Sequence, residues 1–204
     1  MRSRAMRRFN RYYRQCARSF LSYCGRWLYP EALAAFEHAR DESAPLPCAQ
    51  ANLTCTVTCN ERGVLSLYSD CTEWAGTPEA LTLRRADTWN LETGYPITAS
   101  ECFPRGTRVR ALCLAAAREQ CRRQQESSLA VYHPDFSRRL RRNLNLRNFY
   151  LSEKGFHFFY QPWSISPGFE GCPTFLLPFS DSETDAAGPL WPAGNPCNAE
   201  KSIV

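Results

Sequence analysis

The segment from residue 148 to residue 181 constrains the fold most, because short aromatic runs flank a glycine-containing turn. Residues 149–151 and 156–160 read as two strands joined by the turn at 152–155. In the second run, aromatic residues alternate between the two faces, which is the period of a strand and not of a helix. Residues 174–179 predict a further strand. Together these runs predict a small antiparallel sheet near the C-terminal end.

Upstream of this segment, the pattern predicts more strands and then helices. Residues 52–59 are rich in Thr, Val and Cys, and side chains in residues 64–71 alternate between two faces. The two runs form an antiparallel hairpin in our interpretation, with Gly63 supplying a positive φ in its turn. Residues 81–91 predict another strand. Residues 107–125 predict an amphipathic helix, and residues 136–143 a short basic one. The expected fold class is therefore α+β: an antiparallel β-sheet with a packed central helix and an N-terminal helical segment.

The N-terminal segment combines an apolar stripe with many arginines. Residues 7–40 predict helix, and Pro30 is expected to break it because proline lacks the amide donor and clashes with the preceding turn. Residues 1–30 contain eight arginines and no acid. Such an end can bind phosphate in nucleic acid or on a membrane surface, although a solvated helix face is the ordinary alternative. The stripe recurs at steps of three and four: Phe9, Tyr13, Cys16, Phe20, Tyr23 and Trp27.

These patterns divide the chain of 204 residues into three parts. We expect an arginine-rich helical segment at 1–44, one α+β domain at 45–181 and a disordered tail at 182–204, which is rich in Gly, Pro and Ala. No run of 18 or more apolar residues and no signal-peptide pattern occurs. A cytoplasmic location follows as an expectation, unless the chain was cut from a longer precursor.

Eleven cysteines, an odd number, occur without any CxxC spacing. Cys55 and Cys59 share a strand face with Val57, and Cys113 and Cys121 share a helix face. Because free cysteine behaves as a small buried hydrophobe, buried thiols are the favoured interpretation. A disulfide framework and a metal site remain as alternatives.

Little in the sequence indicates catalysis. The three histidines have no ligand spacing, and no nucleophile-elbow, phosphate-loop or dinucleotide motif occurs. Asp70, Glu73 and Asp87 could converge near Gly76 as an acid–base pair, but capping and turn bonds are their more common roles. We therefore expect a protein that is not an enzyme and that needs neither a cofactor nor a metal.

An aromatic loop is the better functional candidate. Tyr160, Trp163 and Phe169 lie among prolines and glycines, and exposed aromatics on such a rigid loop make interface anchors. The competing interpretation places them in the core at the end of the sheet. A second loop would contribute Glu73, Trp74 and Gly76 to the same binding edge.

Three motifs carry a family likeness over residues 50–181. The motifs are Thr56-Val57-Thr58-Cys59-Asn60 with Leu65-Ser66-Leu67-Tyr68, Asp70 and Glu73-Trp74-Ala75-Gly76; Asp87-Thr88-Trp89-Asn90-Leu91-Glu92-Thr93-Gly94; and Asn148-Phe149-Tyr150-Leu151 with Gly155-Phe156-His157-Phe158-Phe159-Tyr160, Pro162-Trp163-Ser164-Ile165-Ser166-Pro167, Gly171 and Leu176-Leu177-Pro178-Phe179. This pattern resembles the C-terminal domain shared by RsiV, a lysozyme-sensing anti-sigma factor, and by PdaC-type peptidoglycan deacetylases. The chain looks most like standalone, unexported members.

The resemblance implies a recognition or sensor module without chemistry of its own, whose ligand would be a lysozyme-like protein. It departs from the family where Trp74-Ala75-Gly76-Thr77-Pro78-Glu79 replaces the usual Tyr-Thr-Gly-Gly-Ala-His. Nucleic-acid or membrane-surface binding through the N-terminal arginines is the alternative function. A weaker alternative, taken from the deacetylases, is a part in the hydrolysis of cell-wall glycans.

Overall fold

Two antiparallel sheets and four α-helices make up the part of the chain that the structure, a computed structural model, describes: residues 4–42, 44, 49–75, 80–179 and 189–190. The α+β class is therefore confirmed. The first sheet has the order β1-β2-β3-β4 and the second the order β5-β6-β7. Their strands are β1 (Ala49–Glu61), β2 (Val64–Ala75), β3 (Leu81–Asn90), β4 (Tyr95–Pro96), β5 (Phe149–Ser152), β6 (Gly155–Phe159) and β7 (Thr174–Pro178).

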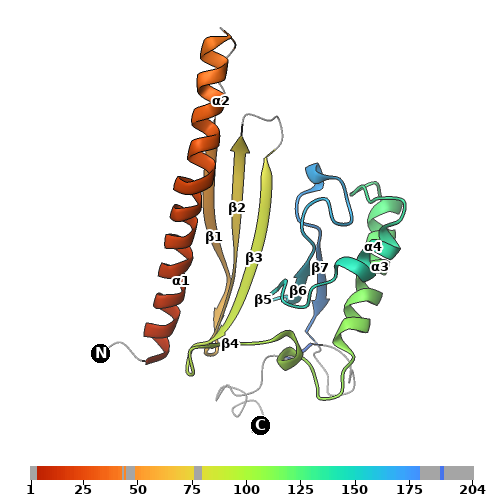
Figure 1. The fold of residues 1–204 in the computed structure, drawn as a ribbon. Coiled ribbons are helices and arrows are strands. Elements are labelled where there is room, and N and C mark those ends of the chain that lie inside the picture. Colours follow the sequence, from red (N-terminus) through yellow and green to blue (C-terminus); the bar gives the residue numbers. More distant parts are fainter. Residues whose placement is uncertain (1–3, 43, 45–48, 76–79, 180–188, 191–204) are drawn as a thin grey trace.

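The helices lie on the two outer sides of this pair of sheets (Figure 1). One long helical rod runs along the first sheet, while α3 and α4 lie beside the second. The helical bounds are α1 (Arg4–Tyr23), α2 (Tyr29–Asp41), α3 (Val109–Glu126) and α4 (Phe136–Asn143), with 3-10 helices at Ala99–Cys102 and Gly168–Glu170. None of the helices in the described ranges combines the length and apolar character that a bilayer crossing requires.

Pro30 does not end the N-terminal helix, so that expectation was wrong. A π-helical turn, Cys24–Leu28, joins α1 to α2, and Pro30 sits in the first turn of α2. The N–H of Tyr29 donates to the carbonyl of Cys24, five residues back. This wider turn lies directly before the proline, where an unbroken α-helical ladder would need the N–H that proline lacks.

The apolar stripe of α1 also ends differently from the prediction. Phe9, Cys16 and Phe20 are partly buried as expected, but Tyr23 and Trp27 are 40% and 65% exposed. The partly buried positions continue instead at Cys24 and Leu28. The predicted stripe therefore matches the face that is turned toward the protein only as far as Phe20.

The hairpins follow the sequence closely. β1 and β2 pair from Glu61↔Val64 outward, and both turn residues have positive φ, 49° at Arg62 and 74° at Gly63. Mirror-image turns of this kind match the twist of the two strands. In the second sheet, β5 and β6 pair from Ser152↔Gly155. A side chain at Gly155 would place its Cβ 2.3 Å from the Leu177 carbonyl oxygen, so this glycine also lets β7 come close.

The main core lies between the second sheet and α3. Phe156, Phe158 and Phe175 are at most 1% exposed, and Cys113, Ala117 and Cys121 of α3 are fully buried beneath them. Burial of the α3 cysteines is confirmed, and the nine cysteines in the described ranges are all free thiols. Burial of Cys59 is confirmed, but burial of Cys55 was a wrong prediction: Cys55 is exposed, and Val57 is 56% exposed. The pairing register of β1 shifts between Val57 and Cys59, so the three residues do not keep one strand face.

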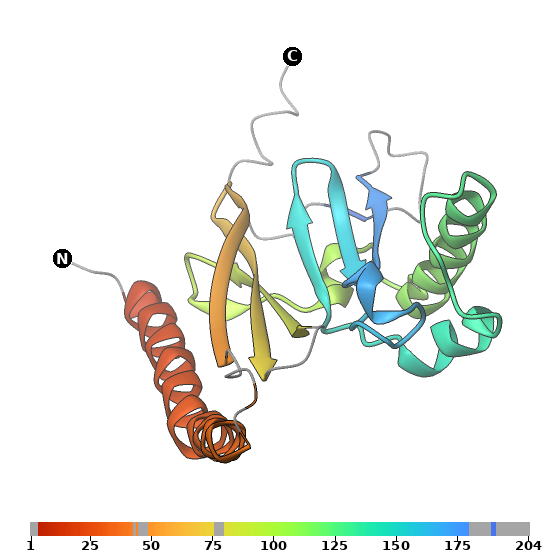
Figure 2. The same ribbon diagram turned by 90° about the horizontal axis from the view of Figure 1, so that it is seen from above.

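Hydroxyl groups join the two sheets where β5 lies against the first sheet (Figure 2). The Thr58 hydroxyl donates to the Leu151 carbonyl (2.7 Å), and the Leu151 N–H donates to the Ser66 hydroxyl (2.8 Å). Ser66 in turn pairs with the Thr88 hydroxyl at 2.8 Å. These buried and partly buried bonds satisfy polar groups that would otherwise oppose the packing of the sheets.

Most of the segment predicted as a disordered tail lies outside the described residues. Pro189 and Leu190 are described, and the Leu190 N–H donates to the Cys102 carbonyl at 2.7 Å. This short part of the segment therefore packs on the domain. The boundaries at residues 44 and 181 stay predictions.

Candidate functional site

An open groove of about 730 Å³ separates α1 from the outer face of the first sheet. Its walls are mostly apolar, and three leucines of the sheet are unusually open to solvent: Leu53 at 40%, Leu81 at 60% and Leu83 at 51%. Contiguous exposed apolar residues often mark a binding surface. We call this space the groove. Three segments line it: Tyr12, Tyr13, Cys16, Phe20 and Tyr23 of α1; Leu53, Cys55, Cys71, Glu73, Leu81, Leu83, Arg85 and Asp87 of the sheet; and Gln161, Pro162 and Trp163.

Polar bonds hold the N-terminal half of α1 to the sheet. The Tyr13 hydroxyl donates to an Asp87 carboxylate oxygen (3.0 Å) and accepts from Nε1 of Trp89 (3.0 Å). The Tyr12 hydroxyl donates to the other Asp87 oxygen at 3.3 Å. Phe9 completes the aromatic cluster around Trp89, with ring centroids 5.6 Å apart. We call Tyr12, Tyr13, Asp87 and Trp89 the tyrosine latch.

The pKa shifts of the latch residues favour the hydrogen bonds from the two tyrosines to Asp87. Burial, followed by the nearby Asp87 charge, raises the pKa of Tyr12 to about 12. The same two causes raise the pKa of Tyr13 further. Both phenols therefore stay protonated at neutral pH and remain donors to Asp87. Burial raises the pKa of Asp87 itself, and the bonds from the two tyrosines oppose that rise.

Trp163 occupies a strained turn at one end of the groove. The Ser164 N–H donates to the Gln161 carbonyl (3.2 Å), and Trp163 has φ 65° at the third position, after Pro162. That position of a type II turn favours glycine, and another residue there costs about 1–2 kcal/mol. The indole is nevertheless 51% exposed, so burial of the ring does not fully offset this cost. Strain kept at an exposed aromatic residue is typical of functional sites.

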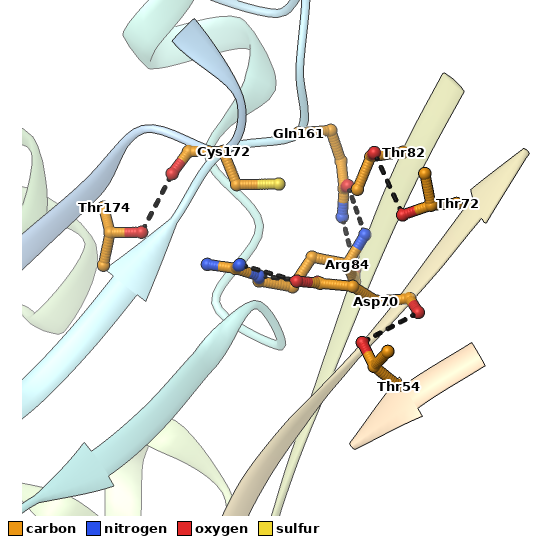
Figure 3. A network of polar contacts seen from close by, with 8 residues as sticks. All are labelled: Thr54, Asp70, Thr72, Thr82, Arg84, Gln161, Cys172 and Thr174. Carbon is orange, nitrogen blue, oxygen red and sulfur yellow. Dashed lines mark hydrogen bonds and ion pairs between the residues drawn. The ribbon is translucent and has the colours of Figure 1, made fainter. Parts of the chain in front are cut away.

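The turn is rigidly supported from the sheet side (Figure 3). The Gln161 side chain pairs with the backbone of Arg84 on β3, accepting from its N–H (3.0 Å) and donating to its carbonyl (2.6 Å). The Arg84 guanidinium forms two bonds to Asp70 (2.8 and 2.7 Å) and lies 4.1 Å from the centre of the Tyr68 ring. These contacts fix the position of the Trp163 turn relative to β3.

Gly168 supports the indole from another side. A Cβ at Gly168 would lie 2.1 Å from Cε2 of Trp163, so only glycine leaves space for the ring. The indole ring therefore packs on Gly168, and the rest of its surface is open to solvent. Phe169, the neighbouring predicted anchor, is 72% exposed but does not line the groove.

Tyr160 is not a surface anchor, which corrects the prediction. It is fully buried, its hydroxyl donates to the Leu140 carbonyl (3.0 Å), and its ring meets Phe175 edge-on at 5.8 Å. It follows β6 on the side that faces α4, so its ring joins the core. The core interpretation thus holds for Tyr160, whereas Trp163 and Phe169 are exposed.

The other predicted loop contributes Glu73 to the groove. Its carboxylate accepts a bond from the Tyr23 hydroxyl at 3.2 Å. Trp74 instead lines a second cavity of about 430 Å³ beside α2, which Glu73 also reaches. Gly76 lies outside the described residues. The structure therefore brings Glu73 and Trp163, but not Trp74, to the same groove.

The described residues offer little for chemistry. Asp70 pairs with Arg84, Asp87 with the tyrosines and Glu73 with Tyr23, so the three carboxylates have separate partners and form no acid–base pair. No group of three or more His, Cys, Asp or Glu residues in the described ranges could hold a metal ion. Burial raises the pKa values of the Cys102, Cys113 and Cys121 thiols to about 12, which disfavours the nucleophilic thiolate. That the protein is not an enzyme stays a prediction.

Most arginines of α1 face away from the groove. Arg8 has a structural role, because it donates to the Thr93 carbonyl (3.0 Å) and lies 4.3 Å from the centre of the Tyr95 ring. Arg7, Arg11 and Arg18 are exposed, and none forms an ion pair with another described residue. Their binding to nucleic acid or membranes stays a prediction.

Comparison with known proteins identifies a domain in the C-terminal half. Residues 103–180 match the family described as a protein of unknown function, DUF3298. No curated protein matches the chain. A DUF3298 family member from Bacteroides fragilis has a similar fold, with a TM-score of 0.57 at 15% identity over 92% of this chain and 74% of that one.

A DUF3298 family protein from Pseudomonas aeruginosa PAO1 also aligns, at 16% identity and a TM-score of 0.49 over 72% of this chain. The alignment covers 65% of that protein, less than two thirds of its length.

The DUF3298 sequence match covers α3, α4 and the second sheet, together with the Trp163 turn. The groove combines this turn with α1 and the first sheet, which lie outside the match. Sequence patterns missed the groove because its walls are far apart in the chain.

Proposed function

We propose that this protein is a non-catalytic recognition module that binds a segment of a partner protein in the groove. The observation that carries the proposal is Trp163, an exposed indole held in a strained turn at the end of an apolar groove. Tryptophan and tyrosine are the residues that most often dominate protein interfaces. The groove supplies both, because Tyr12, Tyr13 and Tyr23 line it together with Trp163 and the leucines of the sheet.

The size of the groove limits what can enter it. A cavity of about 730 Å³ is in the range of small-ligand pockets and cannot hold a whole helix with its side chains. A partner would therefore insert a few apolar side chains from one segment. Fixed contacts around Trp163 reduce the entropy lost on binding, because the ring is already ordered.

We further propose that the module is a sensor domain of the RsiV type. This placement is supported by the resemblance of the three motifs, and the DUF3298 match is consistent with a domain of unassigned role in the same segment. Lysozyme is accordingly the first partner to test. The expected contact would involve Trp163, Glu73 and the leucines of the groove.

The test compares binding of lysozyme, and capture of other proteins, by three variants of the full chain. Trp163→Ala and Leu83→Glu each change the groove, while Phe169→Ala removes an exposed aromatic residue outside it. We expect a true partner to lose about 30-fold or more in affinity with either groove variant, since a central anchor contributes about 2 kcal/mol or more. Phe169→Ala should retain binding.

Two results would contradict the proposal. Identical affinities for the wild type and both groove variants would exclude the groove as the binding site. Equal loss with Phe169→Ala would place the contact on the wider loop. Matching circular dichroism spectra of all variants would show that the losses do not come from unfolding.

A further inference from the structure

A second surface, formed by α4 and part of α3, carries five arginines around two adjoining hollows. The hollows measure about 370 and 670 Å³, and Arg138 and Arg142 line both of them. Arg139 lines the smaller one, and Arg118 and Arg141 the larger. We call this surface the arginine hollow. It is separate from the arginines of α1, which lie on the opposite side of the two sheets (Figure 1).

The positive charge of the arginine hollow is largely uncompensated. Among the described residues that line it, Asp135 is the one carboxylate, and it accepts bonds from Arg138 (2.8 Å) and Arg139 (2.6 Å). Arg118, Arg141 and Arg142 form no ion pair with any other described residue. A hollow with more cations than anions attracts an anionic ligand, and guanidinium groups bind phosphate in a bidentate manner.

Trp163 also lines the smaller hollow, next to Arg138 and Arg142. Two bonds attach its turn to α4: Asn143 Nδ2 donates to the Ser164 carbonyl (2.8 Å), and Tyr160 donates to the Leu140 carbonyl (3.0 Å). The indole and the arginines therefore have fixed relative positions. An aromatic surface beside a cationic track is the arrangement that binds single-stranded nucleic acid.

We propose that the arginine hollow binds single-stranded nucleic acid, with phosphates on Arg138 and Arg142 and a base stacked on Trp163. An acidic protein segment would satisfy the arginines but would leave the indole without a flat partner. Lipid headgroups would likewise pair with the arginines but would offer no planar base for the indole. This binding goes beyond partner recognition in the groove, and only the Trp163 turn takes part in both.

The experiment measures fluorescence anisotropy of a fluorescein-labelled 15-nucleotide oligo-dT with the full chain, over a range of salt concentrations. Arg138→Gln with Arg142→Gln should weaken binding at least tenfold and reduce the slope of log K against log salt by about 1.4, because two phosphate contacts are lost. Trp163→Ala should weaken binding about tenfold and leave the slope unchanged, because stacking carries no charge.

The matched control is Arg122→Gln with Arg123→Gln. These two arginines lie on α3, pair with Glu119 and do not line the hollow, so their loss should leave affinity unchanged. A second variant, Arg118→Gln with Arg141→Gln, tests independently whether the hollow binds the oligonucleotide. Thermal melting of each variant shows whether it folds like the wild type.

Several outcomes would overturn the proposal. One is no oligo-dT binding by the wild type at low salt; another is equal binding by the wild type and both hollow variants. Loss only with a triple Gln variant of Arg7, Arg11 and Arg18 would place the site on α1. Equal competition by a 15-residue polyglutamate peptide, or by phosphatidylglycerol vesicles, would replace nucleic acid by an acidic protein or a membrane. Leu83→Glu tests the groove alone, so the two proposals can fail independently.

Discussion

Two helices cover two sheets in this molecule, with opposite results. α3 closes over the second sheet, where Phe156, Phe158 and Phe175 are at most 1% exposed. α1 runs along the first sheet but leaves Leu81 and Leu83 more than half exposed across an open groove. An amphipathic helix is therefore not sufficient to complete a core; the way in which it is attached decides whether the layer closes.

The difference has a cause in the residues that face each sheet. α3 presents small side chains, Cys113, Ala117 and Cys121, which allow its backbone to approach the sheet. α1 presents large aromatic rings, and its polar bonds to the sheet are concentrated in the tyrosine latch. We call α3 with the second sheet the closed layer and α1 with the first sheet the open layer. The closed layer provides stability, whereas the open layer provides a surface that can bind a partner.

The largest effect expected from this comparison separates the closed layer from the open one. Phe156→Ala removes a fully buried ring that contacts Phe149 (4.8 Å) and Phe103 (5.0 Å), and should lower the free energy of unfolding by about 3–5 kcal/mol. Leu83→Ala in the groove should cost less than about 1 kcal/mol, because its side chain is already half exposed. Urea denaturation of both variants measures the contrast, and equal losses would mean that the groove is closed in solution.

A smaller effect is expected at the attachment of α1. Tyr13→Phe removes the donor to Asp87 and the acceptor of the Trp89 N–H, and should cost about 1–2 kcal/mol of unfolding free energy. Hydrogen exchange of the α1 amides should accelerate in this variant. Tyr12→Phe is the matched control, because its bond to Asp87 is longer, 3.3 Å, and exposed. Faster exchange in the control than in Tyr13→Phe would refute the assigned order of the two tyrosines.

The smallest expected effect is a pH dependence that arises from His157 in the second sheet. Burial, and then the Lys154 charge, lower the pKa of His157 below its usual 6.5. A histidine with a lowered folded pKa favours folding in its neutral form, so its contribution is complete above about pH 6.5 and is lost as pH falls through the folded pKa. His157→Gln should flatten this part of the stability profile. An NMR titration that places the His157 midpoint above 6.5 would contradict the sign.

Local patterns were sufficient for the short helix α4 and for the hairpin turns of both sheets. The predicted helix at residues 136–143 has the bounds of α4, and the glycine turns at Gly63 and Gly155 are where the hairpins reverse. These features depend on residues close together in the chain. The exposure of Cys55 and the burial of Tyr160 depend on what covers each face, which strand alternation does not reveal. The groove and the arginine hollow likewise arise only when distant segments meet.

Gly94 has a mechanical consequence for the open layer. A Cβ at this position would lie 2.5 Å from the Cα of Ala5, so the first turn of α1 touches the loop before β4 backbone to backbone. With the tyrosine latch, this contact fixes the first half of α1 on the sheet, so any tilt of the helix has to start beyond Tyr13. From Tyr13 to Tyr23 the helix extends roughly 15 Å at about 1.5 Å per residue, and a bend of about 10° would move Tyr23 by nearly 3 Å. The 3.2 Å bond from Tyr23 to Glu73 opposes that movement, so the far end of the groove widens only when this bond breaks.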